Sequence, residues 1–111
     1  MEFQDSRMGR AWVIEVRGRV DAAGAALLEA HCHKGLERGD ARLVVDLAGV
    51  DYMASAGLRA LLSLAKKVQP AKGKLVISGA HGPVKEIFDL AGFTSILPMC
   101  ATLEEAAGLV M

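Results

Sequence analysis

Three groups of residues in this sequence carry side chains that could do chemistry. The segment Asp51–Leu62, D-Y-M-A-S-A-G-L-R-A-L-L, holds a single aliphatic hydroxyl, Ser55, among small residues and then turns apolar. A hydroxyl in such a place can act as a nucleophile, cap a helix or accept a phosphate. The triplet 31–33, H-C-H, has the side-chain types that bind zinc. Asp46 ends an apolar run, where a phosphoacceptor aspartate would be placed.

Catalysis by Ser55 lacks the residues it needs. A G-x-S-x-G nucleophile elbow requires glycine two residues before the serine, and Met53 stands there, although Gly57 fits the other side. A hydrolase also needs a base and an orienting acid, and no matched histidine and aspartate are evident. The sequence contains no GxGxxG or GxxxxGK[ST] loop, which excludes a dinucleotide-binding or P-loop enzyme. We therefore predict no enzymatic activity, no catalytic residue and no cofactor.

The cysteines and histidines do not form a metal site. Adjacent residues of a helix are about 100° apart, so the triplet 31–33 cannot converge on one ion, and we interpret it as a helix surface with a buried Cys32. Cys32 and Cys100 show no CxxC spacing, so we expect neither a disulfide nor a metal. His81 precedes Gly-Pro and is interpreted as a loop histidine.

Asp46 is a weak candidate for the phosphoacceptor of a receiver domain, because such a domain also requires an acidic pair after its first strand. The corresponding segment, R-G-R-V-D, contains one acid. We expect Asp46 to bind loop amides or to cap a turn.

Composition limits the class of protein. The 111 residues fit one domain, 1–111, and thirteen basic residues balance thirteen acidic ones. With 5% aromatic residues and no net charge, the chain lacks the basic surface and stacking platforms of a nucleic-acid-binding protein. The first ten residues contain no signal-peptide core, and the longest uncharged run, Leu90–Leu103, is too short to span a membrane. We expect a soluble, cytoplasmic protein without direct membrane insertion.

Hydrophobic periodicity predicts strands that alternate with helices. Trp12, Ile14 and Val16 share one face of a strand whose other face is partly polar, and a hairpin turning near Gly9 precedes it. We predict strands near 12–17, 42–47, 75–78 and 95–97, and helices near 22–38, 57–68, 83–91 and 103–110. The predicted caps are Asp21 for the first helix, Ser55 for the second, and a capping box of Thr102 and Glu105 for the last. The fold class is α/β, a small mixed and mostly parallel sheet packed against about four helices.

Several motifs in this order resemble the STAS domain family. They are G-R-V-D, then V-V-D-L-A-G-V-D-Y-M-A-S-A-G-L-R-A-L-L, then G-K-L-V-I-S-G, then V-K-E-I-F-D-L-A-G-F, and they extend over nearly the whole chain. The chain is most similar to the small, free-standing anti-sigma factor antagonists of bacteria. The resemblance implies partner switching: the unmodified antagonist binds an anti-sigma factor, often a serine protein kinase, and a PP2C-type phosphatase reverses the phosphorylation that abolishes binding.

The resemblance also implies which residues act. The family's phosphoserine corresponds to Ser55, and its conserved strand-end acids correspond to Asp21 and Asp46. The implied partner-binding residues are Asp21, Met53, Ala54, Ser55, Ala56, Gly57 and Arg59. This chain departs from the family signature at positions 48, 54 and 56, all alanine, which leaves Ser55 as the only serine or threonine of the segment. The alternative function is a soluble STAS subunit of a membrane transporter complex.

Overall fold

The computed structural model describes residues 1–90, 92 and 97–110. Its elements follow the order β1 (Glu2–Met8), β2 (Ala11–Val20), α1 (Ala22–Glu37), β3 (Arg42–Met53), α2 (Ser55–Val68), β4 (Lys74–Ser78), α3 (Gly82–Leu90), β5 (Met99–Cys100) and α4 (Leu103–Val110). The radius of gyration, 12.3 Å, is close to the ~13 Å typical of one domain of this length.

One mixed sheet has the strand order β1-β2-β3-β4-β5. The hairpin of β1 and β2 is antiparallel, and the remaining neighbours are parallel. Gly9 turns the hairpin with a φ of 61°, which a glycine adopts without strain. The predicted α/β class and mostly parallel pairing are confirmed.

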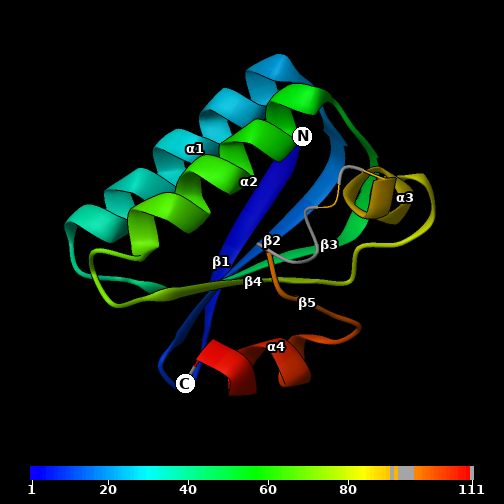
Figure 1. Ribbon diagram of the computed structural model, residues 1–111. Coiled ribbons are helices and arrows are strands. Elements are labelled where there is room, and N and C mark those ends of the chain that lie inside the picture. The colour runs from blue at the N-terminus through cyan, green and yellow to red at the C-terminus, as the bar shows by residue number, and fades with distance from the viewer. Residues whose placement is uncertain (91, 93–96, 111) are drawn as a thin grey trace.

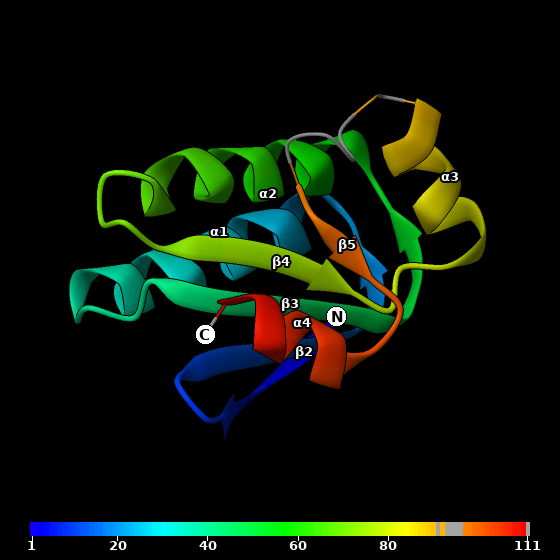
Figure 2. The same cartoon turned by 60° about the horizontal axis from the view of Figure 1, so that its bottom comes forward.

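Two layers of helices cover the sheet. Helices α1 and α2 lie side by side on one face, and α4 lies on the opposite face (Figure 1). The view in Figure 2 shows α4 across β3 and β4, with α3 beyond the ends at which these two strands finish. The main core fills the space beneath α1 and α2 and contains Trp12, Ile14, Leu43 and Leu61. A smaller core packs α4 onto the other face of the sheet.

Most predicted elements are confirmed, with four differences. Strand β2 continues to Val20, beyond the predicted end near 17. Strand β3 continues to Met53, beyond the predicted end near 47. Helix α2 begins at Ser55, two residues before the predicted start. The strand predicted at 95–97 falls partly outside the described residues; Leu97 is described and is not in a strand, and the short fifth strand is Met99–Cys100. Within the described ranges, every helix falls short of the length and apolar character needed to cross a bilayer.

Polar contacts attach the N-terminal hairpin to α1. His31 Nε2 lies 2.7 Å from Asp5 Oδ1. Asp40, in the loop after α1, accepts from the two terminal guanidinium nitrogens of Arg7, at 2.7 and 2.9 Å, and from Nε of Arg38, the C-cap of α1, at 2.7 Å. These hydrogen bonds, that from Arg7 above all, lower the pKa of Asp40. Both acids at this junction therefore have partners, so the hairpin is held to the helix without an uncompensated charge.

The triplet 31–33 is divided among different environments, as the helix geometry predicts. Cys32 is buried in the core, whereas His31 contacts Asp5 and His33 Nε2 lies 3.0 Å from Glu37 Oε1. The two imidazoles thus bind acids on different elements. In the described residues, no cluster of histidine, cysteine and acidic side chains could hold a metal ion.

The thiol of Cys32 is expected to be unreactive in the folded protein. Burial, followed by the charges of Asp5 and Glu29, raises its pKa from 9.0 to about 12. Ellman's reagent should therefore modify half-buried Cys100 in the native state and reach Cys32 only after unfolding. The unfolded chain loses this proton above pH 9.0 and the folded chain only near pH 12, so the stability contributed by the neutral thiol is complete below pH 9.0 and lost between those values. Equal modification rates for the two native thiols would contradict this prediction.

Candidate partner-binding site at the start of helix α2

The ends of the parallel strands bring distant segments together. Strands β2 and β3 finish side by side, because Arg19 pairs with Tyr52 and Val20 with Met53. The Ala54 N–H then donates to the Val20 carbonyl at 2.8 Å, joining the chain after β3 to the end of β2. The start of α1 and the start of α2 are therefore neighbours at one edge of the sheet.

Asp21 caps α1 as predicted. Its Oδ1 accepts from the Gly24 N–H at 2.8 Å, and its backbone is extended, as an N-cap requires. The Asp21 carboxylate is exposed, so it contributes negative charge to the surface while it stabilises the helix.

The prediction that Ser55 caps α2 is wrong. The N-cap is Ala54, with φ −74° and ψ 161°, and no side chain donates or accepts a cap hydrogen bond there. Ser55 is the first residue of the helix and is exposed. The reason is tertiary: the hydrogen bond from Ala54 to Val20 fixes the extended residue one position earlier than the sequence suggests. The positive end of α2 therefore has no side-chain acceptor in the described structure, and Ser55 lies beside it.

Two of the seven proposed contact residues form the floor of the site. Met53 is 2% exposed, and Gly57 is buried against it. A Cβ at Gly57 would lie 2.7 Å from Met53 Cγ and 3.2 Å from Val20 Cγ1, so only glycine allows α2 to approach this closely. The structure places these two residues beneath the surface, where they position the helix start.

The other five residues reach the surface around the helix start. Asp21, Ser55 and Arg59 are exposed, and Ala54 and Ala56 are half-buried. Arg59 lies one turn beyond Ser55 and, together with Ala56, Glu29 and Ala26, lines a shallow groove between α1 and α2. The site is thus a surface of small side chains with one hydroxyl, one carboxylate and one guanidinium. The polar partners of the three histidines are Asp5, Glu37 and the Ala48 carbonyl, so none of them hydrogen-bonds to Ser55.

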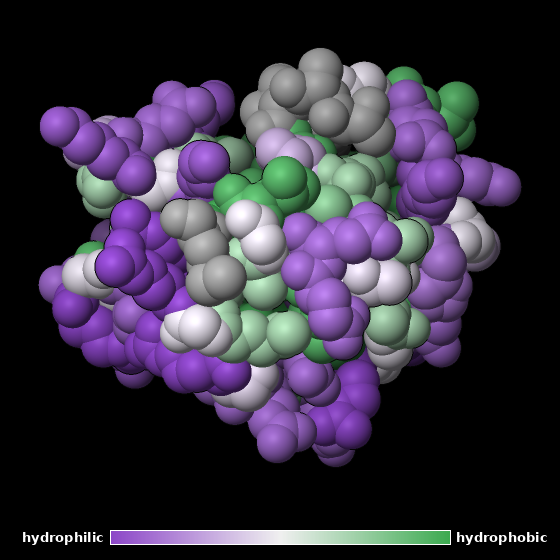
Figure 3. All heavy atoms as spheres, turned by 90° about the horizontal axis from the view of Figure 1, so that it is seen from below, coloured by the Kyte–Doolittle hydropathy of each residue, from purple (hydrophilic) through white to green (hydrophobic). Residues whose placement is uncertain are grey.

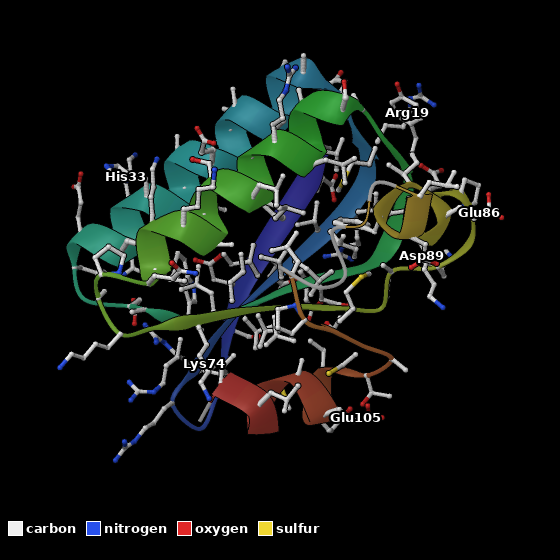
Figure 4. The ribbon with its side chains drawn as sticks, viewed as in Figure 1. Arg19, His33, Lys74, Glu86, Asp89 and Glu105 are labelled. Carbon is white, nitrogen blue, oxygen red and sulfur yellow. The ribbon has the colours of Figure 1, made fainter. Side chains whose placement is uncertain are left out.

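Sequence reasoning missed one exposed pair at this edge. The guanidinium carbon of Arg19 lies 4.2 Å from the centre of the Tyr52 ring, and Figure 4 shows Arg19 at the end of the molecule where α3 lies. Tyr52 is 40% exposed and lies three residues before Ser55. The presence of an aromatic residue three positions before the serine was the available signal in the sequence for this pair. Its stacking with Arg19 depends on the pairing of β2 with β3 and could not be predicted.

Asp46 has the structural role that was expected. Its Oδ1 accepts from the Ala48 N–H at 3.2 Å and from the hydroxyl of the fully buried Ser78 at 3.1 Å. His81 Nε2 donates to the Ala48 carbonyl at 2.9 Å. Gly79 has a φ of +72°, and a Cβ there would lie 2.7 Å from Asp46 Oδ1. Asp46 thus connects the middle of β3 to the end of β4 and takes no part in the surface around Ser55.

Known proteins share this fold and much of this sequence. A model of the STAS domain family matches residues 3–106. BtrV of Bordetella bronchiseptica (strain ATCC BAA-588 / NCTC 13252 / RB50), which is assigned as an anti-sigma factor antagonist, is 39% identical over 92 residues, or 83% of this chain and 79% of BtrV.

Solved structures are similar over nearly their whole length. A Thermotoga maritima protein assigned to the same class has a TM-score of 0.91 at 16% identity, covering 97% of this chain and 93% of that one. The phosphorylated form of the Bacillus cell fate determinant SpoIIAA has a TM-score of 0.77 at 20% identity, covering 97% and 98%. These structures show that the fold is shared, and the match to the family model shows that the sequence is related to STAS domains. The chain belongs to the STAS domain family.

Proposed function

We propose that this protein is an anti-sigma factor antagonist that binds its partner through the exposed start of α2 and is switched off by phosphorylation of Ser55. The partner is an anti-sigma factor with serine kinase activity, and a PP2C-type phosphatase restores the binding form. The identity of 39% with BtrV supports this class, and favours it over the subunit of a membrane transporter complex.

The observation that carries the proposal is the position of Ser55. It is exposed, it opens α2, and the helix has no side-chain cap. A helix start attracts a phosphate because its N–H groups and dipole are positive. A kinase can therefore reach the Ser55 hydroxyl, and the fold tolerates the phosphate that it would carry.

The surface around Ser55 suits a protein partner. Ala54 and Ala56 on either side of Ser55 have small side chains, so a partner can approach the backbone closely. Asp21, Arg59 and the stacked pair of Arg19 and Tyr52 supply charge and an aromatic ring, and arginine and tyrosine are enriched among residues that dominate interface energies.

A pull-down with the full chain tests the proposal. Wild-type protein should capture an anti-sigma factor from a lysate of the source organism, identified by mass spectrometry, and Ser55→Asp should not. Ser6→Asp is the matched control, because Ser6 is an exposed serine on β1, remote from this edge. Capture of the same protein by wild type and Ser55→Asp would contradict the proposal.

Incubation with the captured kinase and ATP should then label Ser55. Peptide mapping is the measurement, and Ser63 is the nearest alternative acceptor on α2. Ser63 is half-buried inside a regular helix, where a kinase cannot extend the backbone, so we expect no phosphate there. Phosphate on Ser63, Ser78 or Thr102 with none on Ser55 would refute the assignment.

A further inference from the structure

The neutral net charge of the chain conceals a separation of charges. The amino ends of β3 and β4, the hairpin turn and the last turns of α1 and α2 all lie at the end of the sheet opposite Ser55. Arg42 and Lys74 are paired neighbours, and the Lys74 N–H donates to the Ala41 carbonyl at 2.8 Å. We call the exposed cations of this end the basic pole: Arg7, Arg10, Arg38, Arg42, Lys66, Lys67, Lys72 and Lys74.

Acidic side chains gather at the other end. Glu86 and Asp89 on α3 and Glu105 in the first turn of α4 lie away from Lys74 in Figure 4. Asp21 and Asp51 are exposed at the same end, after β2 and within the last part of β3. The exposed cations Arg19, Arg59 and Lys85 also lie at this end, so its charges are mixed, whereas cations predominate at the basic pole.

The acids at the basic pole are already bound. Asp40 is held by Arg7 and Arg38, and Glu37 contacts His33. Among the described residues, Arg42, Lys66, Lys67 and Lys72 have no ion pair, and the Nζ of Lys74 donates only to the Leu109 carbonyl, at 3.3 Å. Arg42, Lys66, Lys67, Lys72 and Lys74 thus have no acidic partner within the described part of the chain.

An apolar cleft opens beside these lysines. It has a volume of about 350 Å³, and its walls include Val68 of α2, Leu75 and Val76 of β4, and Leu109 of α4, with Lys74 at its side. The first three are buried, whereas Leu109 is 49% exposed. Figure 3, which faces α4, shows hydrophobic atoms exposed on this side of the molecule, with hydrophilic side chains mainly around its margin. The cleft is large enough for one or two aliphatic side chains.

We propose that the basic pole and its apolar cleft form a second docking site, which binds an acidic segment of a partner protein. An aliphatic side chain of the segment fills the cleft, and its carboxylates lie beside Lys72 and Lys74. About 20 Å of α2 separates this site from Ser55, so the two can be occupied at once.

Other occupants fit the pole less well. A bilayer requires apolar side chains that protrude, but the apolar walls here are recessed, and among the described leucine and valine side chains of this cleft only Leu109 is exposed. Single-stranded nucleic acid requires aromatic stacking platforms, and the tryptophan at this end, Trp12, is 1% exposed beneath Arg38. A symmetric dimer through the cleft would bring two sets of lysines together, which is repulsive.

A peptide titration followed by NMR tests the proposal. The probe is an acetylated and amidated peptide, Glu-Glu-Leu-Glu-Glu, added to the full chain labelled with ¹⁵N. Amide shifts should move around Val68, Leu75 and Leu109, and the binding should weaken as salt is added. A peptide with lysine in place of glutamate should cause no such change, and equal shifts with both peptides would overturn the proposal.

Matched variants separate charge from apolar contact. Lys72→Glu should weaken peptide binding about fivefold, whereas Lys85→Glu, at an exposed lysine of α3, should not. Leu109→Ala should also weaken it severalfold, whereas Leu27→Ala, at an exposed leucine of α1, should not. Melting temperatures of all four variants verify folding, and equal affinities within each pair would overturn the proposal.

Two further measurements distinguish the alternatives. Ser55→Asp should bind the peptide like the wild type, so failure of partner switching at Ser55 leaves this result unchanged. Binding to phosphatidylserine vesicles or duplex DNA, or self-association that Lys72→Glu abolishes, would overturn the proposal if the glutamate peptide does not bind.

Discussion

Phosphorylation of Ser55 is expected to weaken partner binding about a hundredfold to a thousandfold without lowering the melting temperature of the domain. The phosphate adds about −1.5 to −2 charges at the uncapped positive end of α2, where each charge stabilises the helix by roughly 0.3–1 kcal/mol. Arg59, one turn later, is a cation within reach of this end, and the nearby Asp21 carboxylate is engaged by the Gly24 N–H. The local terms therefore favour the phosphorylated fold by a few degrees in melting temperature.

The loss of binding must then arise in the interface. A hydrated, doubly charged group replaces a small hydroxyl, and burying it without a partner costs several kcal/mol, which corresponds to the expected loss in affinity. Calorimetric melting and a binding titration of the phosphorylated and unmodified proteins measure the two effects separately. Arg59→Ala should reduce the thermal gain without restoring binding. A melting temperature several degrees lower after phosphorylation would show that the switch is conformational instead.

Replacing Gly35 by alanine is expected to lower the melting temperature by about 10 °C or more. Gly35 lies on α1 directly above the indole of Trp12, and a Cβ there would be 1.9 Å from Cζ3 and 2.2 Å from Cη2. The ring has little space to move, because His31 packs against it at 5.5 Å between ring centres and the Arg38 guanidinium lies 4.8 Å from its centre. Overpacking of this kind costs about 1–3 kcal/mol and sometimes more.

Gly108→Ala is the matched control for this prediction. Gly108 also lies within a helix, α4, but a Cβ there meets nothing within 4 Å. Alanine should therefore stabilise the domain by up to about 1 kcal/mol through helix propensity. Thermal unfolding measures both variants, and the fluorescence of Trp12, the single tryptophan, reports displacement of the ring in Gly35→Ala. Equal melting temperatures for the two variants would contradict the prediction, because they would show that α1 and the Trp12 ring can move apart without loss of stability.

The elements of this fold follow from the local pattern of the sequence. Trp12, Ile14 and Val16 share one face of β2 and are buried in the main core, whereas the other face carries Val13, buried beneath α4, and the partly exposed Glu15. Leu58, Leu61 and Ala65 recur with helical spacing and bury one side of α2. The caps at Asp21 and Thr102 were predicted because a side-chain oxygen there reaches an amide three residues away, and both hydrogen bonds are present. These features depend on nearby residues alone, so the sequence by itself determines them.

The geometry of the two surfaces was decided only by the tertiary structure. Helix α2 begins at Ser55, and not after it, because the Ala54 N–H is held by Val20, whose position depends on the pairing of β2 with β3. Arg19 stacks on Tyr52 for the same reason. The cations of the basic pole come from distant parts of the chain, and they meet because the amino ends of the parallel strands β3 and β4 lie at the same end of the sheet. Contacts between residues far apart in sequence have no periodic signal, so no pattern in the sequence reports them.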